Sequence, residues 1–395
     1  MRPPKPKYLQ QRKRVGRRRR QQANRGCNFF YLEGATLSRG VAPFVLWQVL
    51  RLVTISAMSW MLHFSLVICS LNLFAPSIQA ADQWTDVSSS LLERLTNSGS
   101  KQPWPGGCSG VVANRLNGNV TIKVVGCGLW CSSDQGKTWQ RIDGDHISGR
   151  DETGWATSAD QNSPTRMASF SLDGSAGWTA DGLNWKSFKS LGRNWDFGSV
   201  DWKAPAMTTI IAAKHETTPP GEVYVTADGG NTWKKLVIYL GDARENGSMV
   251  GALNATTLIY SKGEGIYRST DTGETWAKVS SVNPQTRIPV LFRGCHYLGS
   301  ATGLIISKDN GANWQSQGKA VDIWQGPFFG HDEKEIVVIG KDGVFKTETA
   351  GESWRQVADL KPKEGNFAFS ANWFGLRLGS GERRPLCFGH GKPGI

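Results

Sequence analysis

Four arginines recur at similar distances from tryptophans in this 395-residue chain. Arg150, Arg244 and Arg287 each follow a Trp by eleven residues, and Arg193 follows one by eight. A guanidinium group binds carboxylates, sulfates and phosphates through paired hydrogen bonds, so arginines gathered at one opening would bind an anionic ligand. Five tryptophans accompany them and would suit sugar rings or apolar side chains: Trp155, Trp195, Trp202, Trp324 and Trp373.

A structural interpretation of the same residues is also open. Each Arg would then reach across to an acid of a neighbouring segment, such as Asp151 or Glu245, and each Trp would fill a gap between segments.

Carboxylates in the same connections could hydrolyse glycosidic bonds, which requires two of them about 5–10 Å apart across a groove. The sequence does not show which two would face each other, and acids in loops are usually solvated. The candidates are Asp151, Glu152, Asp196, Asp201, Glu245, Asp322 and Asp332.

Other chemistries have no sequence signal. No Gly-rich phosphate loop, Ser-His-Asp arrangement or His/carboxylate metal cluster stands out, so we expect neither a cofactor nor a metal ion. Residues 1–80 hold thirteen Lys or Arg and one acid, Glu33, and therefore carry +12 of the formal charge of +13. The rest of the chain is nearly neutral, and we expect no nucleic-acid partner for it.

A short phrase that occurs six times sets the spacing of these residues. Four copies fit one template, at residues 132–139, 226–233, 269–276 and 307–314. The copy at 179–185 is one residue short, and the copy at 347–354 has Thr349 where the others have Asp. Successive copies end in a Trp at intervals of 38–48 residues, which indicates one supersecondary unit per repeat.

Each copy is predicted to be a turn between two strands, because β-like runs precede and follow it, such as Val223–Val225 and Lys234–Leu236. The Asp carboxylate would accept backbone N–H groups within the turn, and the Gly would supply a positive φ. The Trp is expected to pack against the next repeat. The acids with this structural role are Asp134, Asp181, Asp228, Asp271 and Asp309.

The phrase resembles the Asp-box (BNR) repeat of sialidase-like β-propellers, and the resemblance covers residues 82–395. It implies an all-β propeller. It does not imply one function, since similar boxes occur in sialidases, xyloglucan-degrading glycoside hydrolases, sortilin-type receptors and photosystem II assembly factors.

We predict seven blades, with six as the alternative. The stretch Trp84–Val87 resembles the strand that follows each box but has no box before it. Residues 366–395 end where a further box is due. Joining the two would close the last blade with an N-terminal strand and cover both exposed sheet edges.

A sialidase-like activity would need an arginine cluster, a Tyr nucleophile and an Asp acid/base. Arg287-Ile288-Pro289 matches the Arg-Ile-Pro part of the sialidase pattern, but Thr286 replaces its aromatic residue and the stretch follows the fourth box instead of preceding the first. Tyr239 and Tyr297 remain as candidate nucleophiles.

Residues 1–80 are expected to direct the chain to export. An apolar run from Leu52 to Ala75 follows the last basic residue, Arg51, and cleavage after Ala80 would fit a signal peptide. The alternative is that residues 52–75 stay as a membrane anchor. Export favours one local disulfide among Cys108, Cys127 and Cys131.

Two functions follow from these observations. The first is an exported, non-enzymatic propeller that binds an acidic glycan or an acidic protein segment at one channel mouth. The second is a glycosidase that uses carboxylates between blades. Two carboxylates converging beside an Arg in an open groove would favour the enzyme, whereas acids individually paired would favour binding.

Overall fold

The computed structural model describes residues 31–33, 83–85, 87–101, 103, 107–241, 248–358, 375–378 and 385–388. The chain divides into two compact units, one of residues 33–84 and the other of residues 1–32 and 85–395. β1 (Tyr31–Glu33) and β2 (Gln83–Thr85) form a two-stranded sheet. The predictions of a signal peptide or an anchor fall on residues outside the described ones. In the described part, no helix is long and apolar enough to cross a membrane.

Six four-stranded antiparallel sheets follow one another along the chain, and in each the strands lie in sequence order. Their strands are β3 (Cys108–Ala113), β4 (Val120–Val124), β5 (Gly128–Ser132) and β6 (Gln140–Arg141); β7 (Thr157–Ala159), β8 (Met167–Ser169), β9 (Gly177–Thr179) and β10 (Trp185–Ser187); β11 (Trp195–Val200), β12 (Ile210–Lys214), β13 (Glu222–Thr226) and β14 (Lys234–Tyr239); β15 (Ser248–Ala252), β16 (Leu258–Lys262), β17 (Ile266–Ser269) and β18 (Ala277–Ser280); β19 (Val290–Phe292), β20 (Cys295–Ser300), β21 (Gly303–Ser307) and β22 (Gln315–Gln317); and β23 (Gln325–Phe329), β24 (Ile336–Gly340), β25 (Gly343–Thr347) and β26 (Arg355–Ala358).

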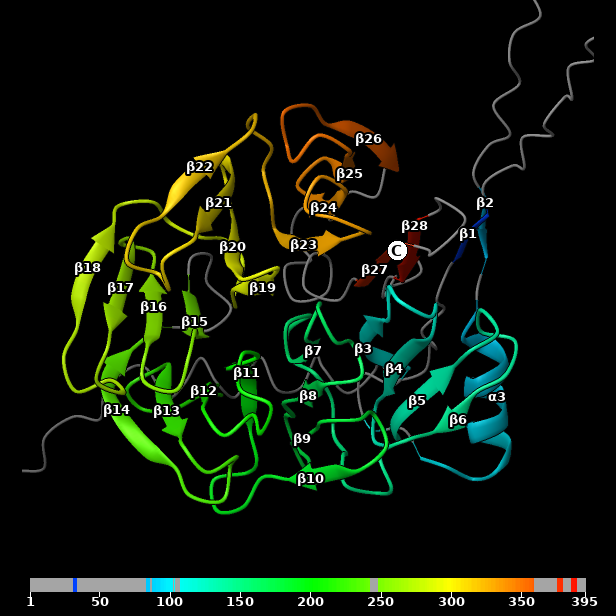
Figure 1. The fold of residues 1–395 in the computed structure, drawn as a ribbon. Coiled ribbons are helices and arrows are strands. Elements are labelled where there is room, and N and C mark those ends of the chain that lie inside the picture. The colour runs from blue at the N-terminus through cyan, green and yellow to red at the C-terminus, as the bar shows by residue number, and fades with distance from the viewer. Residues whose placement is uncertain are drawn as a thin grey trace, which may run out of the picture. The chain divides into compact units, whose positions relative to one another are not determined.

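These sheets are the blades of a β-propeller, which confirms the predicted fold class (Figure 1). The first strand of each blade faces the centre of the ring and the fourth lies outside. The described residues form six four-stranded blades, which is the count we gave as the alternative to seven. A smaller sheet of β27 (Gly375–Leu378) and β28 (Pro385–Phe388) follows, and β27 contacts both β23 and β3.

The predicted closure by an N-terminal strand is wrong for the described residues. Among the described residues, β2 pairs with β1, and no further strand pairs with the β27–β28 sheet. After β2 the chain forms helix α3 (Ser89–Asn97), whose Leu91 and Leu95 are buried against the first blade. The apolar face of this helix packs on the first blade. This packing holds the N-terminal segment there and keeps it from extending the last blade.

Val87 nevertheless contacts the first blade on the side where each later blade contacts the one before it. Its carbonyl oxygen accepts a hydrogen bond of 3.1 Å from Trp139 Nε1. A Cβ added to Gly136, in the first repeated turn, would come within 2.4 Å of the Val87 side chain. The N-terminal segment therefore supports the first blade as an outer strand supports the next blade elsewhere.

The repeated turns pack against the preceding blade, whereas we expected the next. A Cβ on Gly273 of the fourth blade would lie 2.7 Å from Leu236 of the third. The ring of Trp233 in the third blade lies 5.3 Å from that of Phe188, which follows the second. The sequence shows that each Trp needs an apolar neighbour, but either adjacent blade could supply one, and the direction is set by how the blades are arranged around the ring.

The hydrogen bonds predicted for the turn Asp residues are present. In the fourth blade, Asp271 accepts Thr275 Oγ1 at 2.5 Å, Thr275 N at 3.0 Å and Ser269 Oγ at 2.6 Å. Asp134, Asp181, Asp228 and Asp309 accept equivalent bonds. The side-chain bond from Thr138, with a backbone bond from the same residue, lowers the pKa of Asp134 to about 2. The hydrogen bonds of the folded turn therefore stabilise the charged form of these carboxylates.

No disulfide forms among the described cysteines, contrary to our expectation. Cys127, Cys131 and Cys295 are free thiols, and Cys108 is buried without a bond to any of them. Burial raises the pKa of Cys127 and Cys131, so neither is an activated nucleophile.

Candidate functional site

The ring of first strands encloses a channel with two mouths. Since the strands alternate in direction, connections that lead from one blade into the next gather at one mouth, here called the linker mouth; they include residues 142–156, 188–194, 281–289 and 318–324. The connections from first to second strands, such as residues 160–166, lie at the opposite side together with the repeated turns. This second opening is called the turn mouth.

Residues 160–166 of the second blade cross the turn mouth. Gln161 Nε2 donates to the carbonyl of Pro327 at 2.9 Å, and its Oε1 accepts the amide of Phe329 at 2.8 Å. Asn162 Nδ2 donates to the carbonyl of Leu291 at 3.1 Å. These bonds tie the second blade directly to the fifth and sixth, across the channel.

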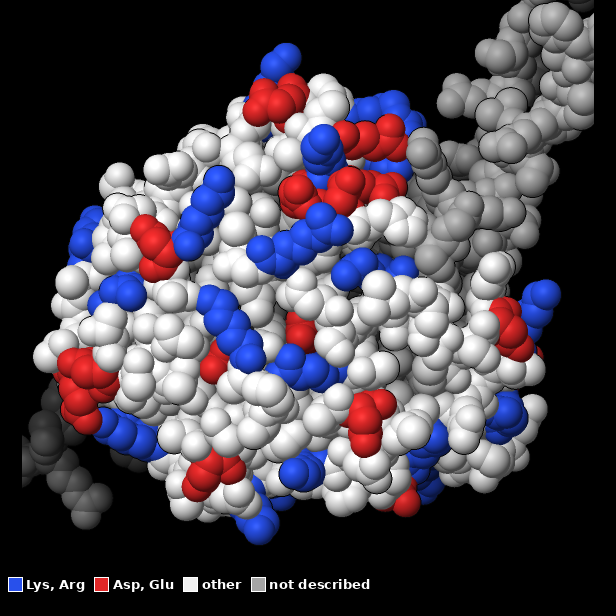
Figure 2. All heavy atoms as spheres, in the orientation of Figure 1, with Lys and Arg blue, Asp and Glu red and all other residues white. Residues whose placement is uncertain are grey.

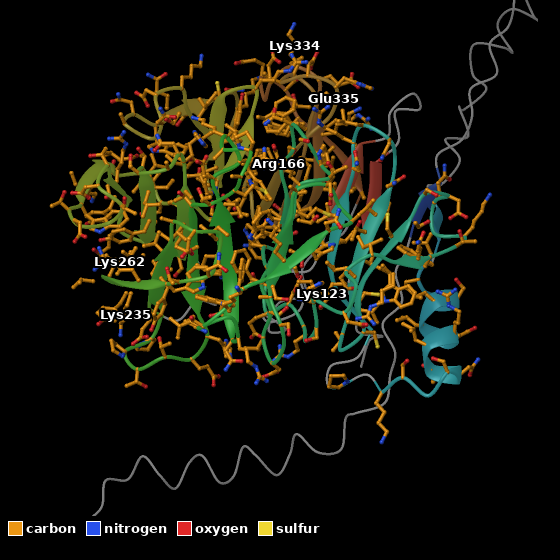
Figure 3. All side chains as sticks on the ribbon, turned by 60° about the horizontal axis from the view of Figure 1, so that its bottom comes forward. Lys123, Arg166, Lys235, Lys262, Lys334 and Glu335 are labelled. Atoms are coloured by element: carbon orange, nitrogen blue, oxygen red, sulfur yellow. The ribbon has the colours of Figure 1, made fainter. Side chains whose placement is uncertain are left out.

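Arg166 anchors the end of this segment. Its Nη1 lies 2.9 Å from Asp160 Oδ2 and donates to the carbonyl of Trp202 at 2.6 Å. Figure 3 shows Arg166 near the middle of the ring of blades. The turn mouth is therefore occupied by the protein's own side chains.

A cavity of about 80 Å³ lies inside the channel. Its walls come from the first, second, third, fifth and sixth blades and include the aromatic side chains of Trp155, Trp202 and Phe328. Gln325, Ser158 and Gln161 provide polar groups to it. Ile288 and Pro289, from the predicted Arg-Ile-Pro stretch, line the same cavity.

The described arginines of the predicted site do not form one exposed cluster. Arg150 Nη1 donates to Glu152 Oε2 at 2.5 Å, and its Nε lies 3.4 Å from Asp173 Oδ2. Arg287 is 3% exposed, lies over the ring of Phe197 and donates to a backbone carbonyl of β15.

Arg193 alone among these described arginines is exposed, and Arg244 lies outside the described residues. The neighbouring side chain of Leu191 is also exposed, and Lys214 Nζ donates to the backbone carbonyls of Leu191 and Arg193. Lys214 thus holds the connection between the second and third blades at the linker mouth.

The predicted aromatic residues are mostly internal. Trp155, Trp195 and Trp202 are buried, and Trp324 is half-buried with its Nε1 bonded to Asp322 Oδ1 at 3.0 Å. Trp373 lies outside the described residues. None of the described ones is an exposed side chain.

Asp151 belongs to a buried ion pair between the first two blades. Its Oδ1 lies 2.7 Å from Lys123 Nζ, and both side chains are fully buried. Asp151 Oδ2 accepts Thr157 Oγ1 at 2.7 Å, and Lys123 also donates to Ser169 Oγ at 3.1 Å. Burial raises the pKa of Asp151 and lowers the pKa of Lys123, so the hydrogen bonds must offset the cost of desolvating both groups.

Asp196 pairs with His215, whose Nδ1 lies 2.6 Å from its Oδ1. Burial lowers the pKa of His215, but the hydrogen bond to Asp196 together with the charges of Asp196, Glu152 and Glu216 outweighs this effect, so the pKa lies above its ordinary value. The carboxylate and imidazole are thus a structural pair at the start of β11.

The remaining candidate acids are bonded to backbone amides or to the groups already described. Asp201 accepts the amide of Lys203 at 3.0 Å, and Asp332 accepts the amide of Lys334 at 2.9 Å. Glu245 lies outside the described residues. Each described candidate carboxylate therefore has its own partner.

The two candidate tyrosine nucleophiles are not placed for catalysis. Tyr239 lies on β14, the outermost strand of its blade, away from the channel. Tyr297 is buried between Phe329 and its own blade, and burial raises its pKa to about 12. In the described residues, no group of His, Cys, Asp and Glu could hold a metal ion.

The cavity residues Gln325 and Ser158, and the crossing residues Gln161 and Asn162, did not stand out in the sequence. The one available signal was a polar residue at the start of an apolar strand, in Gln325-Gly-Pro-Phe-Phe329.

Comparison with known proteins finds distantly similar solved structures. No family model and no curated protein matches the chain. Among solved structures, it is similar to a GH74 xyloglucanase from Xanthomonas campestris, with 14% identity over 70% of this chain and 55% of that one, and a TM-score of 0.31. The chain thus spans about half the length of that enzyme.

Two other solved structures are similar to it. YCF48 bound to D1 peptide has 14% identity, over 74% of this chain and 96% of that one, with a TM-score of 0.39. The extracellular domain of a one-component system from B. thetaiotaomicron has 10% identity, over 72% and 37% of the two chains, with a TM-score of 0.43.

Proposed function

We propose that residues 82–395 are an Asp-box propeller that binds an acidic protein segment at the linker mouth and does not catalyse a reaction. The pairing of the candidate carboxylates supports this proposal most directly. Glycoside hydrolysis needs two carboxyl groups free to act on one bond. Here Asp151, Glu152 and Asp196 are each bonded to a basic side chain.

The shape of the channel favours a protein segment over a glycan. A sugar needs an exposed aromatic face or a cavity of its own size, and the described tryptophans of the predicted site are buried or half-buried. A cavity of about 80 Å³ is smaller than the ~150 Å³ that accommodates benzene. The partner therefore docks on the surface of the mouth.

The exposed groups there suit an acidic partner. Arg193 offers a guanidinium fork, and Leu191 beside it offers an apolar contact. Figure 2 shows Lys/Arg and Asp/Glu side chains interspersed over one face of the molecule, so recognition depends on local contacts and not on a single broad field. Residues 1–80 serve export, either as a cleaved signal or through an anchor at 52–75.

The binding experiment uses a labelled Glu-rich peptide and its Gln counterpart. We expect the Glu peptide to bind more tightly, with an affinity that falls as salt rises. The double variant Arg193→Ala/Arg244→Ala should weaken binding more than tenfold and leave thermal stability nearly unchanged. Arg355→Ala, on the outermost strand β26, is the control and should change neither quantity.

The competing glycosidase function is tested with the same protein. Incubation with a panel of aryl glycosides, including a sialoside, should release no product above the buffer control. Hydrolysis that disappears in Glu152→Gln would overturn the proposal, as would equal binding of the two peptides.

A further inference from the structure

Gln325, at the start of β23, has an unsatisfied side-chain amide inside the channel. The residue is 1% exposed, and it lines the central cavity. Neither its Nε2 nor its Oε1 has a hydrogen-bond partner. Leaving a buried polar atom unpaired lowers stability, so two such atoms on one side chain indicate a missing partner.

A second polar group in the same cavity is also unpaired. Ser158, on β7 of the second blade, lines the cavity, and its buried Oγ has no partner. The hydroxyl can donate or accept. The unpaired groups of the cavity are thus an amide donor, an amide acceptor and a hydroxyl, between the aromatic walls formed by Trp155, Trp202 and Phe328. The other polar side chains of its lining are bonded within the protein: Arg115, Thr157, Asp160 and Gln161.

We infer that this cavity is a binding site for a small carboxamide group. A carboxamide carries an N–H donor and a C=O acceptor in one plane, so it satisfies Gln325 Oε1 and Nε2 together in a cyclic pair of hydrogen bonds. A carboxylate would leave Oε1 without a donor, and an ammonium would leave Nε2 without an acceptor. The apolar ring faces around the amide cover the rest of the ligand.

The size of the cavity limits the ligand to a few atoms. Its volume of about 80 Å³ corresponds to two or three water molecules at ~30 Å³ each. That space suits an amide with one or two carbons, either as a free molecule or as the end of an Asn or Gln side chain of a partner. Since residues 160–166 cross the turn mouth, the ligand enters from the linker mouth.

This site is independent of the proposed partner surface. Gln325 and Ser158 are not among the residues that we expect to contact the acidic peptide. Loss of peptide binding and loss of amide binding can therefore be told apart by the two sets of variants.

The experiment is saturation-transfer NMR of acetamide with the full-length protein. We expect a transfer signal for acetamide, at least tenfold weaker signals for acetate and N,N-dimethylacetamide, and competition by excess unlabelled propionamide. The dimethyl compound lacks the N–H donor and acetate lacks it too, so both test the cyclic pair. N-acetylglutamine methylamide distinguishes the source: competition by it indicates a partner's side chain, and its failure indicates a free amide.

Gln325→Met keeps the side-chain size but removes both polar atoms, and should reduce acetamide binding at least tenfold without lowering the unfolding midpoint. Ser158→Ala is the second variant and should reduce binding several-fold. The control is Gln317→Met on β22, where Nε2 donates to the Ala350 carbonyl; it should leave acetamide binding unchanged. An absent acetamide signal with wild-type protein would show that the cavity holds water only, and an equal signal with Gln325→Met would likewise refute the site.

Discussion

At the scale of single residues, Lys123 and Asp151 show how burial changes the value of an ion pair. Both are fully enclosed between the first two blades, whereas the Lys235–Glu222 pair lies on an outer strand with Lys235 43% exposed. Figure 3 shows Lys123 within the strands and Lys235 toward the outside of its blade. Removing one partner of a buried pair leaves an uncompensated charge in a medium that solvates it poorly.

We therefore expect Lys123→Met to lower the free energy of unfolding by about 3–5 kcal/mol in urea titrations. Lys235→Met, as the exposed control, should leave the free energy of unfolding nearly unchanged, because water and salt screen a surface pair. The double variant Lys123→Met/Asp151→Leu removes both charges and should recover most of the loss. A double variant as unstable as the single one would mean that packing, and not the unpaired charge, causes the effect.

The turn carboxylates contribute to stability in a pH-dependent way. Their pKa values are lowered, whereas burial raises the pKa of Asp151. Hydrogen bonds hold the pKa of Asp271 below its ordinary value near 3.8, so its contribution to stability is complete above that value and is lost as pH falls through the lower folded pKa. Asp271→Ala should lower the unfolding midpoint by a few degrees at neutral pH, and the difference from wild type should narrow on acidification below about pH 4. Peptide binding should not change.

Thr349→Ala in the sixth blade is the matched control for this effect. Thr349 Oγ1 accepts the amide of Ser353 at 3.0 Å in the place of an Asp carboxylate. A hydroxyl does not titrate between neutral pH and pH 4, so Thr349→Ala should lower the unfolding midpoint equally at both pH values. A pH-independent cost for Asp271→Ala would contradict the role given to its charge.

At the scale of elements, the segment 160–166 acts as a tie across the ring. Repeats in such folds mainly contact their neighbours, and in the described residues few other bonds cross the ring; one is from Lys203 Nζ of the third blade to Asn310 Oδ1 of the fifth. Gln161 bonds two backbone groups of the sixth blade, the carbonyl of Pro327 and the amide of Phe329. In the described residues the sheet after the sixth blade has two strands, so contacts that pass through the centre help to hold the ring together.

Gln161→Ala should therefore lower the free energy of unfolding by about 1–3 kcal/mol, because it leaves buried backbone groups without partners. Amide hydrogen exchange at Phe329 should become faster than in wild type. Asn254→Ala is the control, since Asn254 bonds only amides of its own loop, at Thr256 and Thr257. Unchanged exchange at Phe329 would show that Gln161 does not hold the sixth blade.

At the scale of the whole molecule, what the sequence by itself determined is the repeated unit. The phrase ending at Trp139, Trp233 or Trp276 carries its own hydrogen bonds between residues at most four apart, so it specifies the turn, the strands around it and the interval of a blade wherever it occurs. The propeller and the structural role of the turn carboxylates were predictable for that reason.

Tertiary structure alone decided the rest, because the contacts involved join residues far apart in the chain. Arg287 and Arg150 each follow the Trp of a repeated turn by eleven residues. Arg287 is nevertheless buried, whereas Arg150 pairs with the neighbouring acids Glu152 and Asp173. The place of the N-terminal segment, the crossing residues and the unpaired amide of Gln325 depend on which blades meet across the channel. Local spacing carries no information about such distances, whereas the closed ring fixes them.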